Sequence, residues 1–396
     1  MSGSNRQRQH YRQRAGGASK TAWMLKDAGE LIQMLTSTSL EPDSTAVSSE
    51  LVFETLCSYN WQDDGTAILV PGGPPRWEPP PLPVTLSPDS GLNCKNQGIS
   101  RVPKYPFEPA FQAMSIMNPN LQLDGVDIIA NRNSLRKLFD FVAGKRQEPF
   151  CMGLCMVKNT LFISRKEKTA RMMIHGYANS GYGHNFEEAF STPEPGLAGS
   201  GSHHRVIRYD LGHLNCVVRF EVDAYHTDSD DTAQHLVDDL TTTISQLTVN
   251  ELPMSSTTQP STNVIQRGTF IQASKLAEMK VRKAERINDA MPQLWFGRTP
   301  YLLVGKHVEG VVHSTTCSHV ERQFEAWETN NQGNLRKLVT LLAELKLMVR
   351  GVEGRAAVLV CAEKGAPLQI LRTKNKTDVL PRKIVENHWS REGDGD

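Results

Sequence analysis

The stretch Leu214-Asn-Cys-Val-Val-Arg-Phe-Glu-Val-Asp-Ala224 decides the fold class of this 396-residue chain. Its even-numbered positions are all apolar or small, whereas Asn215, Arg219, Glu221 and Asp223 occupy odd-numbered ones. This period of two predicts a strand with one face in the core. The other face presents Glu221 and Asp223 about 6.6–6.8 Å apart, and carboxylates at that spacing repel unless a cation, a proton or a base lies between them. The alternative interpretation is the solvated face of an edge strand.

A second strand with polar groups on one face follows later in the chain. Apolar residues alternate along 271–281 and place Glu278 and Lys280 together on the opposite face. We expect this strand to end near Val281 and a helix to begin near Lys283. Glu-x-Asp on one strand and Glu-x-Lys on the next suit a metal-dependent nuclease. Hard divalent cations prefer carboxylate oxygens, and a lysine orients or helps deprotonate an attacking water.

The body around these strands is predicted to be α+β. Residues 126–163 show a strand, a short helix over 134–142 and two further strands. Residues 220–266 contain eight acids and no Lys or Arg. The part over 227–263 is rich in Ser, Thr and Asp, so we interpret it as a long, partly disordered insertion between the two acidic strands.

The N-terminal part of the chain has a different character. Apolar residues between Trp23 and Leu35 come close to helical spacing and predict a short amphipathic helix. Residues 71–88 contain eight prolines, which remove too many N–H donors for a strand ladder or a helix interior. They predict an extended, polyproline-like wrap or linker, which is either surface filler or a proline ligand for another domain. The apolar Trp77, Leu82 and Val84 favour packing of this segment against the body.

Composition excludes several classes of protein. The 44 Lys and Arg nearly balance 43 Asp and Glu, which excludes a histone-like or wholly polyanionic protein. Seven Cys without a CxxC pair favour a reducing compartment, nuclear or cytoplasmic. The longest apolar run, Ala356–Ala362, is far shorter than the roughly 18 residues of a membrane-spanning helix. Residues 1–22 are basic without the apolar region of a secretory signal, so we expect a disordered arm.

A series of short motifs runs through the chain in a characteristic order. They are Asp127–Leu138, Gly181–Glu187, Phe220–Asp223, Ala277–Lys280, Gln293–Gly297 with Tyr301–Gly305, a helix over 334–350 and a strand pair over 358–371. This order resembles the DXO family of RNA 5′-end decapping nucleases, whose core is related to PD-(D/E)xK nucleases. The resemblance covers about residues 124–371. It implies mixed β-sheets flanked by helices around a nuclease cleft.

The resemblance also implies roles for individual residues. The ligands of one or two Mg²⁺ or Mn²⁺ ions, direct or through water, would be Glu187, Glu221, Asp223 and Glu278. Lys280 and Gln293 would position the nucleophile and the scissile phosphate, and Arg132 would contact RNA. The alternative for Arg132 is a surface ion pair with Asp124 or Asp127. Two features depart from the family pattern. One is the long insertion between the two acidic strands. The other is the motif that begins at Gln293, which is offset by one residue relative to its glycines.

The expected function is a metal-dependent hydrolase of RNA 5′ ends, by decapping, pyrophosphohydrolysis or deNADding, with 5′–3′ exonuclease activity left open. The alternatives are a catalytically weak scaffold that binds RNA ends or a partner exonuclease, and a DNA-directed nuclease. This chain retains all four acids and Lys280, which favours catalysis over a scaffold. The resemblance implies a role in mRNA decapping and RNA quality control. The expected organisation is a basic arm over 1–22, an N-terminal helix and wrap over 23–123, a catalytic domain over 124–380 and a polar tail over 381–396.

Overall fold

The computed structural model describes residues 21–50, 52–65, 67–94, 97–145, 147–177, 179–227, 262–283, 287–375 and 378–390. Nearly all of the expected basic arm and insertion, and the end of the expected tail, lie outside these described residues. Those expectations, and the domain boundaries, therefore stay predictions. No described helix is long and apolar enough to cross a membrane.

The described strands form three sheets, of which the largest mixes parallel and antiparallel pairs. Its spatial order is β1 (Ala28–Leu35), β20 (Leu368–Thr373), β19 (Ala356–Cys361), β8 (Phe150–Val157), β9 (Thr160–Lys166), β7 (Ile128–Asn131), β13 (Leu214–Val222), β12 (Ser200–Leu211), β2 (Glu54–Gln62), β3 (Ala67–Pro71) and β15 (Asn263–Arg267). The strand predicted from residues 214–224 thus lies in the middle of this sheet, next to β7 and β12.

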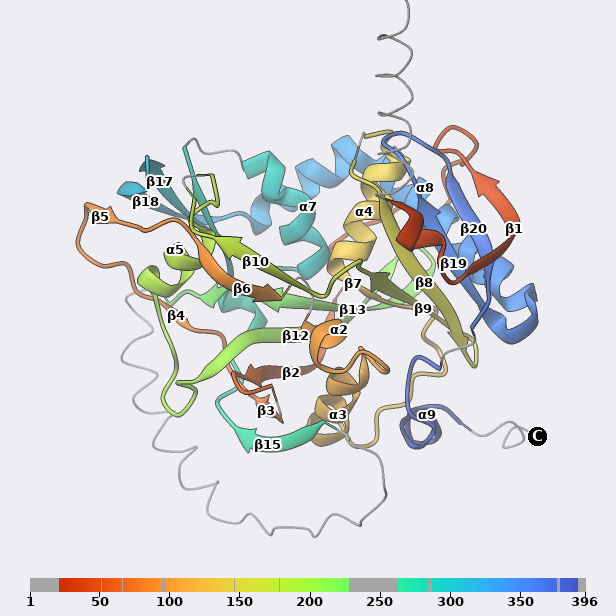
Figure 1. The fold of residues 1–396 in the computed structure, drawn as a ribbon, viewed down its shortest axis with the longest axis horizontal. Helices are drawn as coiled ribbons and strands as arrows, with labels where there is room; N and C mark the ends of the chain where they lie inside the picture. The colour runs from red at the N-terminus through yellow and green to blue at the C-terminus, as the bar shows by residue number, and fades with distance from the viewer. Residues whose placement is uncertain are drawn as a thin grey trace, which may run out of the picture.

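The second sheet and a two-stranded ribbon lie beside the first (Figure 1). The second sheet has the order β11 (Ser191–Thr192), β4 (Arg76–Trp77), β14 (Ala224–Tyr225), β16 (Leu276–Arg282), β17 (Tyr301–Val308), β18 (Val311–His319) and β5 (Val84–Thr85). The ribbon pairs β6 (Ser90–Cys94) with β10 (Arg171–His175). Because β14 follows β13 after a single residue, the chain passes directly from the large sheet to the second one.

Helices cover both faces of the large sheet (Figure 1). The helical elements are η1 (Ala22–Leu25), α2 (Gln97–Arg101), α3 (Glu108–Met117), α4 (Arg132–Val142), α5 (Gly183–Phe190), η2 (Ala273–Lys275), α7 (Ile287–Gly297), η3 (Glu321–Gln323), α8 (Phe324–Gly351), η4 (Glu353–Arg355) and α9 (Arg382–His388). One core packs α4, α7 and α8 against the sheet, and another packs α3 and α9 against its opposite face. The even-numbered residues of β13 are buried in the first of these cores, as predicted.

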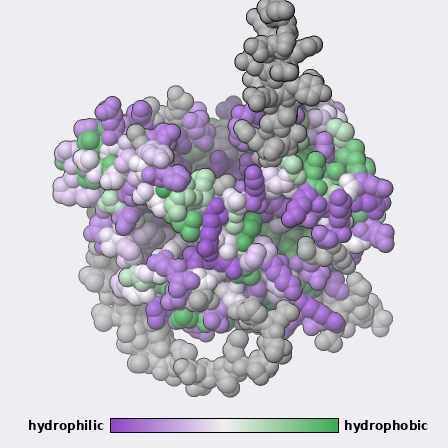
Figure 2. Space-filling view, viewed as in Figure 1, coloured by the Kyte–Doolittle hydropathy of each residue, from purple (hydrophilic) through white to green (hydrophobic). Residues whose placement is uncertain are grey.

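The predicted N-terminal helix is wrong, because most of that segment is the strand β1, which among the described strands pairs with β20 alone and forms an edge of the sheet. Its pairing is irregular, with register shifts between Ala28 and Leu31 and between Leu31 and Gln33. At these bulges the side chains of the strand do not alternate regularly, so its apolar residues need not follow a period of two. Leu31 and Met34 stay about half exposed. Figure 2 shows a patch of hydrophobic residues at the upper right of this face of the molecule.

The expectation that the proline-rich segment packs against the body is confirmed for Trp77 and Val84 but wrong for Leu82, which is 38% exposed. Trp77 packs against the body, with its ring stacked 5.9 Å from that of Phe190. The expectation that the segment forms no ladder is wrong for β4 and β5, which both pair with neighbouring strands. Their four residues are not prolines and keep their N–H donors.

Other boundaries also shift. The second acidic strand begins at Leu276 rather than near 271, because residues 273–275 form the turn η2. Residues 284–286 lie outside the described part, and the following helix is described from Ile287. The helix expected over 334–350 begins ten residues earlier, at Phe324.

Candidate active site

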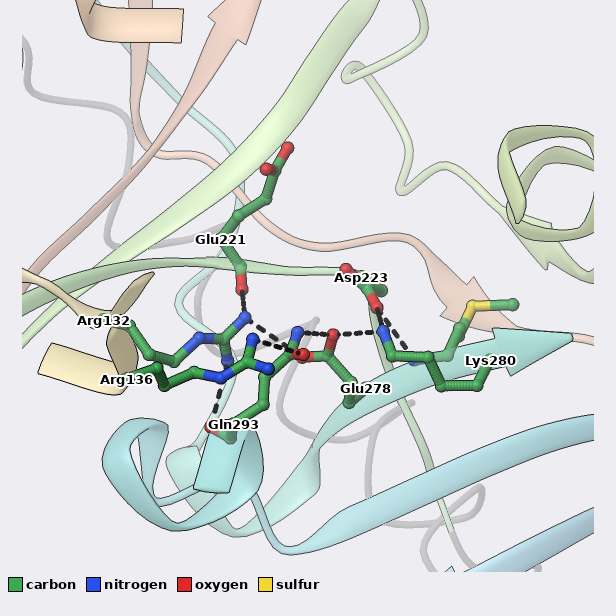
Figure 3. Close-up of polar contacts among 8 residues, drawn as sticks. Arg132, Arg136, Glu221, Asp223, Glu278, Lys280 and Gln293 are labelled. Carbon is green, nitrogen blue, oxygen red and sulfur yellow. Dashed lines mark hydrogen bonds and ion pairs between the residues drawn. The ribbon is translucent and has the colours of Figure 1, made fainter. Parts of the chain in front are cut away.

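The acidic strands meet where the chain leaves the large sheet. Asp223 is the single residue between β13 and β14, and Ala224 pairs with Ala277 on β16. Asp223 Oδ2 accepts a hydrogen bond from the backbone N–H of Met279 at 2.8 Å and lies 3.7 Å from Lys280 Nζ (Figure 3). The structure therefore brings the two sequence motifs to one point.

Glu278 is the most tightly held carboxylate of this group. Its side chain is 1% exposed, and its Oε1 accepts hydrogen bonds from Lys280 Nζ, at 2.5 Å, and from Gln293 Nε2. Its Oε2 forms an ion pair with Arg132 Nη2 at 3.1 Å. Burial by itself would raise the pKa of Glu278, but Lys280 and Arg132 lower that pKa to about 2. Oε1 of an ionised Glu278 is thus hydrogen-bonded twice, whereas the buried Oε2 has the Arg132 ion pair but no hydrogen-bond partner among the described residues.

Arg132 begins α4 and lies inside the protein rather than on its surface. It is 7% exposed, its guanidinium lies 5.1 Å from the centre of the Phe220 ring, and its Nη2 donates to the backbone oxygen of Glu221 at 3.1 Å. The alternative of a surface ion pair with Asp124 or Asp127 is wrong, because Arg132 pairs with the buried Glu278. Its role as an RNA contact stays a prediction.

Gln293 reaches the site from α7. Its Oε1 accepts a hydrogen bond from Arg136 Nη1 at 3.0 Å, while its Nε2 donates to Glu278. The helix is fixed from the far side by Trp295, whose Nε1 donates to the buried Glu328 of α8 at 2.6 Å. Sequence reasoning missed Arg136. Its position four residues after Arg132 places it on the same helix face, but nothing local in the sequence indicates its contact with α7.

Glu187 and Glu221 approach from two other elements. Phe186 and Phe190 anchor α5 in the core of the second sheet, and half-buried Glu187 lies between them in sequence. Burial, followed by the charge of Asp223, raises the pKa of Glu187 well above its usual range. In Figure 3 the carboxylate of Glu221 points away from Glu278. Burial also raises the pKa of Glu221, and burial together with Glu278 raises that of Asp223 to about 7.

The family described as "Domain of unknown function (DUF8563)" matches residues 30–389. The chain belongs to this family. No curated protein matches the sequence.

Solved structures share the fold of this DUF8563 chain. Schizosaccharomyces pombe Rai1 is 11% identical, with a TM-score of 0.54 over 86% of this chain and 99% of its own. Scheffersomyces stipitis Rai1 is 12% identical, with a TM-score of 0.57 over 91% and 98%. Candida albicans Rai1 in complex with pU5-Mn²⁺ is 11% identical, with a TM-score of 0.54 over 90% and 98%. The expected resemblance to the DXO family and the α+β architecture are confirmed at the level of the fold.

The donor set fits a hard divalent cation. Among the described residues, no three His, Cys, Asp or Glu side chains are already grouped tightly enough to hold a metal ion. Glu187, Glu221 and Asp223 nevertheless offer only carboxylate oxygens, and all three have raised pKa values. A divalent cation would relieve their repulsion and desolvation, and oxygen ligands are those that Mg²⁺ and Mn²⁺ prefer. Glu278 differs from them, since it would have to exchange a present partner for the ion.

Proposed function

We propose that this chain hydrolyses phosphodiester or pyrophosphate linkages at RNA 5′ ends with the help of one or two Mg²⁺ or Mn²⁺ ions. The observation that carries the proposal is the convergence of Asp223, Glu278, Lys280 and Gln293 at the crossing between two sheets. The fold supports it, because Candida albicans Rai1, which shares that fold, is in complex with pU5-Mn²⁺.

In this proposal Glu187, Glu221 and Asp223 hold the ion. A bound ion of this kind supplies an acidified water and charge stabilisation at the phosphate oxygens. Burial opposes the charge on Lys280, but the neighbouring Glu278 and Asp223 outweigh burial and raise its pKa. Lys280 is therefore a cation at neutral pH, so it orients the phosphate and offsets its charge rather than accepting the proton of the water. Gln293 contributes a second donor beside it.

The test is a product analysis on RNAs that differ only at the 5′ end, which carries triphosphate, unmethylated cap, NAD or hydroxyl. Each RNA is incubated with Mg²⁺, Mn²⁺ or a chelator. We expect metal-dependent product from the natural chain, and loss of product in Asp223→Asn and Glu221→Gln. Glu188→Gln, an exposed carboxylate on α5, is the matched control and should retain activity.

Two outcomes would contradict the proposal in different ways. Product that forms equally in chelator would exclude the metal-dependent mechanism. RNA that binds but is not cleaved with any 5′ end would favour the scaffold that binds RNA ends. A 5′–3′ exonuclease partner and a nuclear or cytoplasmic location stay predictions.

A further inference from the structure

Gln293 is held between a cation and an anion. Arg136 Nη1 donates to its Oε1 at 3.0 Å, and its own Nε2 donates to Glu278 Oε1 (Figure 3). A carboxamide has one acceptor end and one donor end. Rotating it by half a turn would place its oxygen against a carboxylate and its N–H groups against a guanidinium. The two neighbours therefore select a single orientation of the amide.

The environment of Arg136 is poor for stability alone. Among the described residues it forms no ion pair, and its buried Nε has no hydrogen-bond partner. It also lies on the same face of α4 as Arg132, another cation. Burial and Arg132 lower the pKa of Arg136, and the charges of Glu278 and Asp140 offset this only in part. A desolvated charge with one hydrogen bond is costly. The contact that Arg136 makes across to α7 is with the Gln293 side chain.

We propose that Arg136 is a positioning residue, which holds the Gln293 amide with its N–H groups toward Glu278 and the acidic site. This inference rests on the proposed function, in which Gln293 acts as a donor. Without Arg136, the amide loses the contact that fixes its oxygen and samples other rotations. A donor displaced by about 1 Å lowers turnover on the order of 10²-fold.

The first test does not depend on activity. The side-chain amide of Gln293 is observed by ¹⁵N NMR on glutamine-labelled protein and assigned with Gln293→Asn. We expect hydrogen exchange of this amide to accelerate on the order of tenfold in Arg136→Ala. Arg136→Lys should largely retain the slow exchange, because one N–H donor suffices for the single bond to Oε1. The matched control is Lys137→Ala, the next cation on α4, which lies over the Phe150 ring and should leave the signal unchanged.

The second test separates positioning from direct contact with RNA. We expect Arg136→Ala to lower kcat on the order of 10²-fold with little change in KM. The double variant Arg136→Ala/Gln293→Ala should be no slower than Gln293→Ala, because both changes remove one unit. The inference would be overturned if the double variant lost the product of the two single losses in kcat and if Arg136→Ala reduced the salt slope of RNA binding by about one. Arg136 would then contact an RNA phosphate directly.

The inference and the proposed function fail in distinguishable ways. An unchanged Gln293 signal in Arg136→Ala overturns the positioning role, whatever the activity. A natural chain that cleaves none of the RNAs removes the proposed function, and the amide measurement then decides the orientation of Gln293 by itself.

Discussion

Arg132→Ala tests whether a buried ion pair holds the acidic site together. The side chain of Glu278 is 1% exposed and that of Arg132 is 9% exposed, so water cannot replace the lost guanidinium. Removing one partner of a buried pair costs about 3–5 kcal/mol. In Arg132→Ala, Lys280 Nζ remains 2.5 Å from the Glu278 carboxylate. We therefore expect the free energy of unfolding to fall by about 3 kcal/mol, the lower end of this range.

The loss should depend on pH in a defined direction. The pKa of Glu278 is lowered from 4.5 to about 2 in the folded protein, so its ionisation stabilises the fold. This contribution is fully present above about pH 4.5, the unfolded value, and is lost as the pH falls toward 2. In Arg132→Ala the folded pKa rises, because one of the two cations that lower it is absent. The difference between the natural chain and the variant should therefore be largest near neutral pH and shrink below about pH 4.

The assay is urea unfolding followed by tryptophan fluorescence at pH 7 and pH 4. Arg208→Ala is the control, because its pair with Glu54 is 32% and 47% exposed and such pairs contribute about 0–1 kcal/mol. A loss below about 1 kcal/mol for Arg132→Ala at pH 7, with weaker RNA binding and a salt slope reduced by about one, would refute this reasoning. Arg132 would then act on RNA, as the family resemblance implies.

Three further predictions concern the same site. Asp223→Asn should stabilise the folded chain by roughly 1–4 kcal/mol at and above pH 7, because the pKa of about 7 of Asp223 makes its ionised form unfavourable in the fold. Urea titrations should show that this gain disappears below about pH 4. Mn²⁺ should raise the Tm of the natural chain and raise that of Asp223→Asn less, as thermal-shift measurements would show. Trp295→Phe should cost about 1–3 kcal/mol by unfolding and reduce activity, because it removes a donor from buried Glu328 and loosens α7; unchanged stability would contradict it.

The central part of the fold could be predicted from local pattern. Along β13 the period of two fixes which side chains enter the core, and the even-numbered positions are all buried. The helix after Ile128–Asn131 and the strands on either side of Lys158 could also be predicted from the local pattern of apolar residues. The order of motifs implied that Asp223 and Glu278 meet. Local pattern alone could not show this, because the pairing of β14 with β16 joins segments that are distant in the sequence.

Other features had no local signal. β1 was mistaken for a helix because its bulges break the alternation on which strand prediction rests. Arg136 was missed because its contact with Gln293 depends on how α4 packs against α7, which a single sequence does not encode in any one window. The contacts of Glu278 with Arg132, Lys280 and Gln293 could not be predicted either, because they need α4, β16 and α7 to come together.

The four acids of the site therefore fall into two environments with different consequences. Glu278 is neutralised by Arg132 and Lys280, and its pKa is lowered. The other three have raised pKa values, although Asp223 lies 3.7 Å from Lys280 Nζ. A carboxylate whose charge is already stabilised by cations gains less from a metal ion than carboxylates whose pKa values are raised. In the proposed function, Glu278 therefore holds Lys280 and Gln293 in place, and Glu187, Glu221 and Asp223 offer oxygens to a divalent cation.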